Sequence, residues 1–315
     1  MLEEQDRVYA GKLLREIGDT VTLGFLSTDH PENTRFKKFI EAFASLSDRI
    51  RVEVRESAGE DLPAIIVGGQ VYYHAIPDKT EFSPFMDAIS LSAKDRPSIV
   101  FPNGADLKVI VMPGCIYCPN AVRNAVGFAF SNNGVQVSII DGMMFQPAIA
   151  KFDIKSAPTT IINDQVFLTG VIPENDLIRW VRNTNEKRFS IDDFVTMIKE
   201  GNAHKLAGMM IDDGIIYPDF LSLLRDDQWS LRLGAMVVLE DIHEKKPSLI
   251  KTVIKEIEQD LFDNDLRNRC DAAFLIGNIG GKDSIPVLES AMAARKEEAF
   301  LESLEEAISL IRNRE

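Results

Sequence analysis

Residues 107–130 have the sequence LKVIVMPGCIYCPNAVRNAVGFAF, and this stretch decides the fold. Residues 107–112 are apolar except for Lys108 and predict a buried β-strand, and the apolar spacing over 120–132 predicts a helix. A Pro-Gly turn follows the strand, and Cys115 and Cys118 come immediately before the helix. The stretch therefore predicts two cysteines, three residues apart, where a strand passes into a helix.

This placement gives the two cysteines distinct chemical roles. Residues three apart in a first helical turn lie on one face, within the Cα separation that a disulfide permits. The unpaired N–H groups and the positive dipole end of a helix stabilise a thiolate, so we expect them to lower the pKa of Cys115. Cys118 lies further into the helix and is expected to be more buried. The pattern predicts a redox pair in which Cys115 attacks a disulfide and Cys118 displaces the partner.

Size and charge limit the classes of partner. The chain has 315 residues and a net charge of −14, from 35 basic and 49 acidic side chains, and 45% of its residues are hydrophobic. Such a charge disfavours binding to nucleic acid and to anionic membranes. No apolar run approaches the roughly 20 residues of a membrane span, and the N-terminus has no signal-peptide core. These features predict a cytoplasmic protein, in which a close cysteine pair is catalytic or metal-binding.

The first 186 residues contain a repeated order of elements. A shift of 95 positions places Pro63 on Pro158 and Ile66 on Ile161. Each half is predicted to follow the order β-α-β-α-β-β-α, with parallel crossovers first and a hairpin last. A structural duplication is the simplest explanation.

The C-terminal region has helical periodicity and a second repeat. DQWSLRLGAMVVLEDI (227–242) aligns without gaps to NDLRNRCDAAFLIGNI (264–279), with Arg232 opposite Arg269, and 300–311 is a weaker third copy. A period of about 37 residues made of helix pairs indicates an α-solenoid, in which each repeat buries its apolar face against the next.

Three other side chains are assigned by their place in helical patterns. Cys270 stands opposite the apolar Leu233 in the repeat, which predicts a buried side chain. Trp180 and Trp229 are predicted to be core or interface residues.

A zinc site and a pair of inert cysteines remain alternatives to the redox pair. Zinc needs about two further ligands. The remaining candidates lack partner spacing; they are Cys270, His30, His74, His204 and His243. The strand before the cysteines and the helix after them favour redox chemistry, and no metal is expected.

The cysteine segment resembles the thioredoxin superfamily, with CIYCP between strand and helix and Ala157-Pro158-Thr159 before a hairpin. Over residues 1–186 the tandem layout is similar to the glutaredoxin-like protein disulfide oxidoreductases and to the duplicated N-terminal region of alkyl hydroperoxide reductase flavoproteins. The resemblance implies that Pro158 is a cis-proline facing the cysteines, and that the backbone before it pairs with an extended substrate. Ile116 and Tyr117 are the further substrate-groove candidates, with a packing role as the alternative for Tyr117.

The sequence also departs from the family pattern. In the first half the cysteine positions fall near Asp29 and Glu32, so this half is expected to lack dithiol chemistry and to form an exposed acidic loop that caps the next helix. The strand 107–112 offers no buried carboxylate of the thioredoxin kind. The sequence therefore leaves two candidates for the group that accepts the proton of Cys118, namely water and the start of the helix.

We expect an α/β fold of two tandem thioredoxin-like domains followed by an all-α HEAT-like solenoid. The expected ranges are 1–103 for the domain without the cysteine pair, 104–186 for the domain with it, 187–214 for a helical connector and 215–315 for the helical repeats.

The predicted function is thiol–disulfide exchange with protein substrates through Cys115 and Cys118, without a cofactor, since no flavin- or nicotinamide-binding glycine motif is present. Electrons would come from a recycling reductase or a small thiol. Reduction of the protein substrates is favoured over their net oxidation. One alternative is a redox-responsive adaptor that binds a partner protein through its helical repeats. Another is an electron relay to a single peroxidase or reductase.

Overall fold

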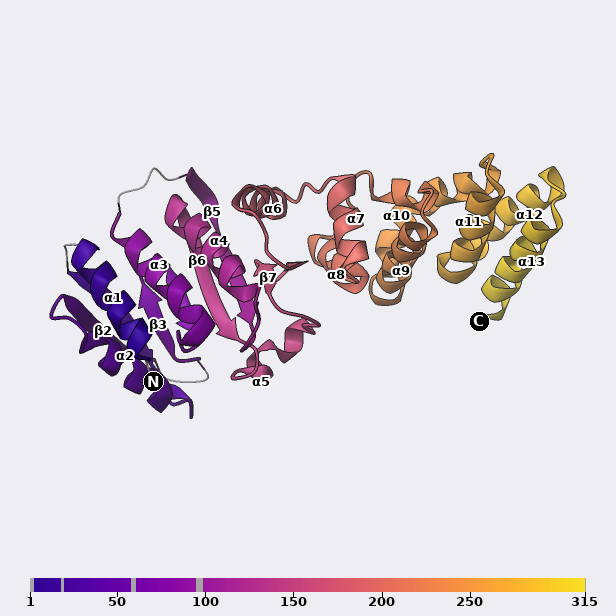
Figure 1. Cartoon of the computed structure of the whole chain (residues 1–315). Helices are drawn as coiled ribbons and strands as arrows, with labels where there is room; N and C mark the ends of the chain where they lie inside the picture. The colour runs from indigo at the N-terminus through magenta and orange to yellow at the C-terminus, as the bar shows by residue number, and fades with distance from the viewer. Residues whose placement is uncertain (1–2, 18–19, 58–60, 95–98, 315) are drawn as a thin grey trace. The chain divides into compact units, whose positions relative to one another are not determined.

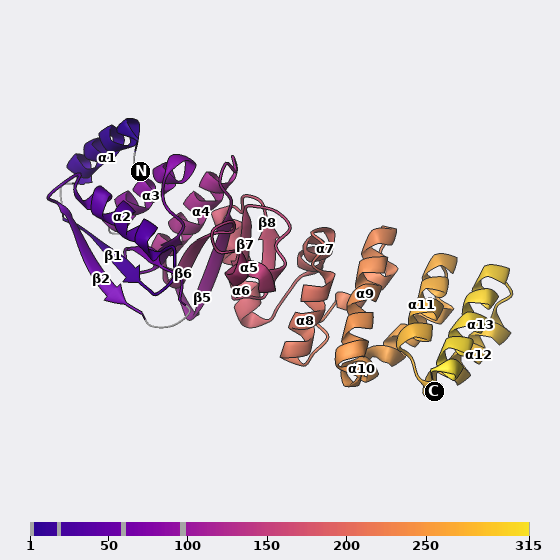
Figure 2. The same cartoon turned by 90° about the horizontal axis from the view of Figure 1, so that it is seen from below.

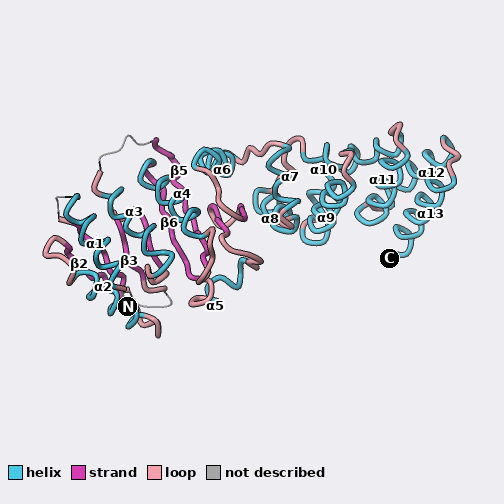
Figure 3. Tube along the Cα trace, viewed as in Figure 1, coloured by secondary structure: helices cyan, strands magenta, loops and turns pink. Residues whose placement is uncertain are grey.

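The computed structural model describes residues 3–17, 20–57, 61–94 and 99–314. The chain divides into two compact units, Met1–Glu186 and Lys187–Glu315 (Figure 1). The first unit combines a sheet with helices, whereas the described part of the second contains helices and loops and no strand (Figure 3).

The first unit contains two successive sets of elements. The first set is α1 (Glu4–Ile17), β1 (Val21–Ser27), α2 (Asn33–Ala44), β2 (Ile50–Glu56), β3 (Ala64–Val67), β4 (Val71–His74), the 3₁₀ helix η1 (Lys79–Glu81) and α3 (Phe82–Ser92). The second set is β5 (Ile99–Val111), α4 (Cys118–Ser131), β6 (Asn132–Asp141), α5 (Gln146–Ile149), the 3₁₀ helix η2 (Ala150–Phe152), β7 (Thr159–Ile162), β8 (Val166–Thr169) and α6 (Glu174–Glu186).

The eight strands described join in one sheet, in the order β2-β1-β3-β4-β6-β5-β7-β8. The pairs β1/β2, β4/β6 and β5/β6 are parallel, and the two hairpins are antiparallel. Strands β1, β4, β5 and β6 therefore run in the same direction and end at the same edge of the sheet. The loop that carries the cysteines lies at this edge, together with the loops that follow β1, β4 and β6.

Two expectations for the first unit are wrong. The predicted boundary between 103 and 104 falls inside β5, because the turn-like residues before it lie in a register shift between Val100 and Ala105 rather than in a loop. Such an irregularity accommodates Gly104, whose φ is +65°. The helix expected between β2 and β3 is absent from the described residues there, because only seven residues separate the two strands.

Helices of both sets pack together over the sheet. Helix α2 buries the apolar face predicted from its spacing, and Phe39 and Phe43 make ring contacts with Phe85 of α3. Helix α3 in turn contacts α4, and the two lie side by side in both views (Figures 1 and 2). Arg123 of α4 pairs with Asp87 at 2.7 Å and donates to Ser83 at 2.9 Å. The first set of elements thus supports the helix that begins at the second cysteine.

The second unit is built from helices. They are α7 (Ile191–Lys199), α8 (Ala203–Asp213), η3 (Phe220–Arg225), α9 (Trp229–Lys245), α10 (Pro247–Ile257), η4 (Glu258–Phe262), α11 (Leu266–Ile279), η5 (Lys282–Ser284), α12 (Ile285–Ala294) and α13 (Glu298–Asn313). Among the described residues, no helix is both long enough and apolar enough to cross a membrane.

The two aligned arginines of the second unit make the same contacts. Arg232 and Arg269 are 3% and 2% exposed. The Nη1 of Arg232 donates to the carbonyls of Asp226 and Asp227, at 2.9 and 3.3 Å, in the loop before its helix. Arg269 donates in the same way to the carbonyls of the loop before α11. Two segments 37 residues apart thus share one buried interaction.

The predicted burial of three side chains has mixed outcomes. Trp180 is buried as expected. Trp229 is 61% exposed, because it is the first residue of α9 and precedes the buried face of that helix. Cys270 and its counterpart Leu233 are both half-buried, so full burial of Cys270 was a wrong prediction.

Candidate functional site

Cys115 and Cys118 form a disulfide with a Cα–Cα distance of 5.5 Å. Strand β5 ends at Val111, and α4 begins at Cys118. The expectation that both cysteines lie in the first helical turn is wrong for Cys115, which precedes the helix. Pro119 stands at the start of α4, where its fixed φ and missing N–H favour helix initiation.

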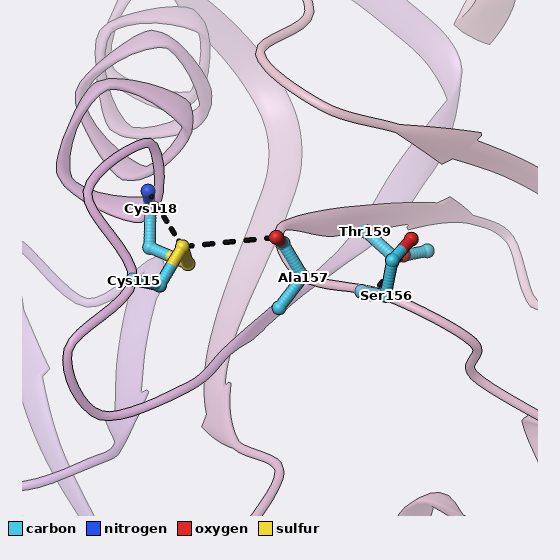
Figure 4. The surroundings of a disulfide bond; sticks show 5 residues. All are labelled: Cys115, Cys118, Ser156, Ala157 and Thr159. Carbon is cyan, nitrogen blue, oxygen red and sulfur yellow. Dashed lines mark hydrogen bonds between the residues drawn. A yellow bond between two sulfur atoms is a disulfide. The ribbon is translucent and has the colours of Figure 1, made fainter.

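The start of α4 points a backbone donor at the first sulfur. The amide of Cys118 donates a 3.1 Å hydrogen bond to Sγ of Cys115 (Figure 4). The amide of Cys115 donates to the carbonyl of Met112, at 3.1 Å. The positive end of the helix dipole acts in the same direction. The loop therefore places Cys115 where negative charge on sulfur is stabilised.

Ala157 and Pro158 lie opposite the disulfide. The Ala157–Pro158 peptide bond is cis, and Pro158 is buried. The carbonyl oxygen of Ala157 lies 3.7 Å from Sγ of Cys115 and faces the two sulfurs (Figure 4). Tertiary folding thus brings together residues that are 42 positions apart in the chain.

The two sulfurs differ in access to solvent. Cys118 is 0% exposed, whereas Cys115 is half-buried. Ile116 and Tyr117, which lie between them, are 75% and 62% exposed. An incoming group therefore reaches Cys115 first.

Two exposed methionines lie in the redox turn and in the loop that adjoins it. Met112 precedes the cysteine turn and is 37% exposed, and Met143 follows β6 and is 59% exposed. Their loops adjoin, since a Cβ added to Gly142 would come within 3.1 Å of Sδ of Met112. We call Met112, Ile116, Tyr117 and Met143 the apolar rim of the site.

Glu81, which no sequence pattern singled out, is a buried carboxylic acid beside the cysteine helix. It is 9% exposed, and neither carboxylate oxygen has a hydrogen-bond partner among the described residues. Burial raises its pKa to about 7; Arg123 opposes this shift, and Asp141 adds to it. Its 3₁₀ helix η1 contacts α4. The first set of elements thus contributes a buried carboxylic acid in a segment that contacts α4.

The acidic loop of the first half is only partly as predicted. Asp29 is exposed, and Glu32 pairs with Arg35 at 2.7 Å. Glu32 occupies the N-cap position of α2 but makes no side-chain capping bond. Asn33 instead accepts a hydrogen bond from the amide of Thr28 through its side-chain oxygen, at 3.1 Å. The prediction that the acidic side chains cap the helix is therefore wrong.

Metal-ligating side chains do not gather elsewhere in the part of the chain that is described. No group of three or more His, Cys, Asp and Glu residues there is placed to hold an ion.

Comparisons with known proteins agree with this geometry. A family model described as a thioredoxin domain matches residues 105–182. The chain is similar in structure to the alkylhydroperoxide reductase AhpF of Enterococcus faecalis, at 18% identity and a TM-score of 0.51, over 57% of this chain and 99% of that one. It is also similar to a protein disulfide oxidoreductase of Aeropyrum pernix K1, at 18% identity and a TM-score of 0.52, over 61% and 97%.

At such low identity, these likenesses show the fold alone. A search of curated proteins finds no match. The cysteine turn, the cis-proline opposite it and the family match together identify residues 105–182 as a thioredoxin-like domain.

Proposed function

We propose that the protein is a thiol–disulfide oxidoreductase that exchanges disulfides with protein substrates through Cys115 and Cys118. The observation that carries the proposal is the disulfide at the start of α4. Its accessible sulfur accepts a hydrogen bond from the amide of Cys118, and its other sulfur is fully buried. A nucleophile that is accessible and stabilised as an anion, next to a shielded resolving thiol, is what dithiol exchange requires.

The exchange proceeds in two balanced steps from the reduced pair. The Cys115 thiolate attacks one sulfur of a substrate disulfide, forms a mixed disulfide and releases the other substrate sulfur as a thiolate. Cys118 then loses its proton and attacks Sγ of Cys115, which releases the second substrate thiolate. The product is the oxidised pair that the structure contains, and the substrate has gained two electrons.

Glu81 is the proton acceptor that we propose for Cys118. A buried carboxylate with a pKa near 7 exchanges protons readily at neutral pH, where an ordinary glutamate is already ionised. Its 3₁₀ helix contacts α4, whose first residue is Cys118. Proton transfer to Glu81 would leave a neutral acid in a site that disfavours the carboxylate.

The substrate would lie between the apolar rim and the cis-proline segment. Ala157 faces Cys115, so a substrate strand paired with the backbone before Pro158 would bring its sulfur to the nucleophile. Ile116 and Tyr117 are exposed beside this path. We assign substrate contacts to Ile116, Tyr117, Ala157 and Pro158.

The physiological direction that we propose is reduction of substrates in the cytoplasm. Electrons would return from a reductase protein or a small thiol. A glutathione- or thioredoxin-poised compartment keeps such a pair mostly reduced.

We further propose that the two sets of elements in the first unit are tandem thioredoxin-like domains, the second beginning with β5, and that 215–315 forms HEAT-like repeats after the connector 187–214. A second candidate function, a redox-responsive adaptor, is favoured by exposed apolar side chains in the repeats. Trp229 is 61% exposed, Phe262 42% and Leu266 38%. This function requires these side chains to form one contiguous patch, because contiguous apolar patches mark protein-binding surfaces.

The first test is reduction of insulin disulfides. Cys115→Ser is expected to lose the activity, Cys118→Ser to accumulate mixed disulfides, and Cys270→Ser to behave as the wild type. Full activity of Cys115→Ser would eliminate the proposal. Capture by Cys118→Ser distinguishes the two functions: many covalent clients support the enzyme, whereas one non-covalent partner held through 215–315 supports the adaptor.

A further inference from the structure

The loops of both halves lie along one edge of the sheet in the first unit. Strands β1, β4, β6 and β5 all end at this edge, and they are followed by residues 28–33, 76–81, 141–145 and 112–117. The redox turn is the last of these loops. A chain bound to the disulfide could therefore continue over loops of the first half without leaving the edge.

Direct contacts connect these loops. The ring of His30, in the loop after β1, lies 5.1 Å from the ring of Phe145, in the loop after β6. The loop after β6 also adjoins the redox turn through Gly142 and Met112. The buried ring of Phe145 thus packs the loop of Asp29 and Glu32 against the loop after β6, which in turn adjoins the redox turn, so these loops form one edge.

The chemistry of this surface changes along its length. Next to the disulfide this surface is apolar, because the apolar rim of the site lies there. Farther away, residues 28–33 and 76–81 carry the acidic side chains Asp29, Glu32 and Asp78, the buried Glu81 and one basic side chain, Lys79, and Asp141 ends β6. Glu32 is paired with Arg35, and Asp141 accepts the amides of the loop that follows it. The carboxylates of Asp29 and Asp78 have no hydrogen-bond or ion-pair partner among the described residues, so their charge is uncompensated there.

We infer that this edge binds substrate segments that are apolar beside the reactive cysteine and carry Lys or Arg a few residues away. The inference rests on the proposed function and names its substrate class. The first half would act as the docking site for the basic part, through Asp29 and Asp78. Opposite charges across such a surface raise association rates and suppress acidic competitors.

Strand spacing gives the expected position of the basic residues. Neighbouring strands lie about 4.8 Å apart, and an extended chain advances about 3.3 Å per residue. Strand β4 is two strands from β5, and β1 is four strands away. A substrate that crosses the sheet edge would therefore reach Asp78 about three residues from its cysteine and Asp29 about six residues from it.

The test uses peptides that carry one cysteine as a mixed disulfide with thionitrobenzoate, which is released when Cys115 attacks the peptide sulfur. Apolar residues flank the cysteine, and positions three to six away on both sides are Lys in one peptide and Glu in the other. Reduced full-length protein should react about tenfold faster with the Lys peptide at low ionic strength. The preference should shrink as salt is added.

Three variants locate the effect. Asp29→Asn/Asp78→Asn should abolish the preference but keep the wild-type rate with uncharged 2-hydroxyethyl disulfide, which also reports correct folding. Asp29→Asn should weaken the preference. Asp48→Asn is its matched control, because it removes an exposed carboxylate just before β2, at the opposite edge, and should change nothing.

Equal rates for the two peptides, or a preference for Glu, would overturn the inference, and so would a Lys preference that survives in the double variant. Failure of the proposed function gives a different result, namely no reaction of the wild type with either peptide or with 2-hydroxyethyl disulfide.

Discussion

The amide of Cys118 donates to Sγ of Cys115 at 3.1 Å, so the buried cysteine supplies, through its backbone, part of the stabilisation of its exposed partner. This bond exists because α4 begins at Cys118 and leaves that N–H without a carbonyl one turn earlier. The same helix start buries the Cys118 side chain completely. The start of α4 thus stabilises negative charge on Cys115 and shields Cys118 from solvent.

This asymmetry predicts the order of alkylation after reduction. Cys115 should react with iodoacetamide at least about tenfold faster than Cys118, because the thiolate reacts only where the reagent has access. Peptide mass mapping of a time course measures both rates. Equal labelling of the two cysteines in the folded protein would contradict the site geometry.

Glu81 should make stability depend on pH. Its pKa is about 7 in the folded protein against 4.5 as the unperturbed value, because burial disfavours the charged form. The stabilisation associated with the protonated acid is therefore complete below about pH 4.5 and is lost as the pH rises to about 7. Relative to Glu81→Gln, the wild type should lose stability across this window, by up to the order of 3 kcal/mol.

Urea denaturation between pH 4.5 and 8 checks this prediction. Trp180 fluorescence in a Trp229→Phe background reports on the first unit, because Trp180 is buried there. Glu41→Gln, exposed on α2, should give a profile parallel to the wild type. Parallel profiles for the wild type and Glu81→Gln would show that the Glu81 carboxylate is not destabilised by burial.

Arg232 should be essential for the stability of the second unit. Its side chain is 4% exposed, pairs with Asp271 at 2.6 Å and donates to two loop carbonyls. Arg232→Leu leaves these acceptors unsatisfied and should cost about 3–5 kcal/mol. Arg267→Leu, at a position 59% exposed, should change the free energy of unfolding by less than about 1 kcal/mol. Thermal unfolding followed by far-ultraviolet circular dichroism compares them, and similar losses would contradict the assignment.

Two helical glycines should respond oppositely to alanine. A Cβ on Gly234 of α9 would come within 2.3 Å of Cγ2 of Ile198, so Gly234→Ala should destabilise by about 1–3 kcal/mol. Gly208 of α8 has open space, so Gly208→Ala should stabilise by about 0.5–1 kcal/mol. Chemical denaturation of both variants measures the difference, and destabilisation by Gly208→Ala would show a contact that the structure lacks.

Much of the first unit followed from local patterns. The spacing of Phe36, Phe39, Ile40 and Phe43 predicted the buried face of α2, and the glycine pair after Val67 predicted a hairpin. The prediction was wrong where a turn-like sequence, Pro-Asn-Gly, lies inside β5. Pairing with β6 on both sides of the irregularity keeps the strand continuous, and the sequence of β5 alone contains no record of that pairing.

In the candidate site, too, some features followed from the sequence and others only from the tertiary structure. Sequence alone identified Cys115 and Cys118 and the different accessibility of their side chains, because three-residue spacing at a helix start is a local geometric property. Only the tertiary structure placed Glu81 beside the cysteine helix and aligned the loop of Asp29 with the redox turn. These relations depend on how distant segments pack: burial of a carboxylate and the order of strands in a sheet arise from contacts across the whole unit, which no local pattern encodes.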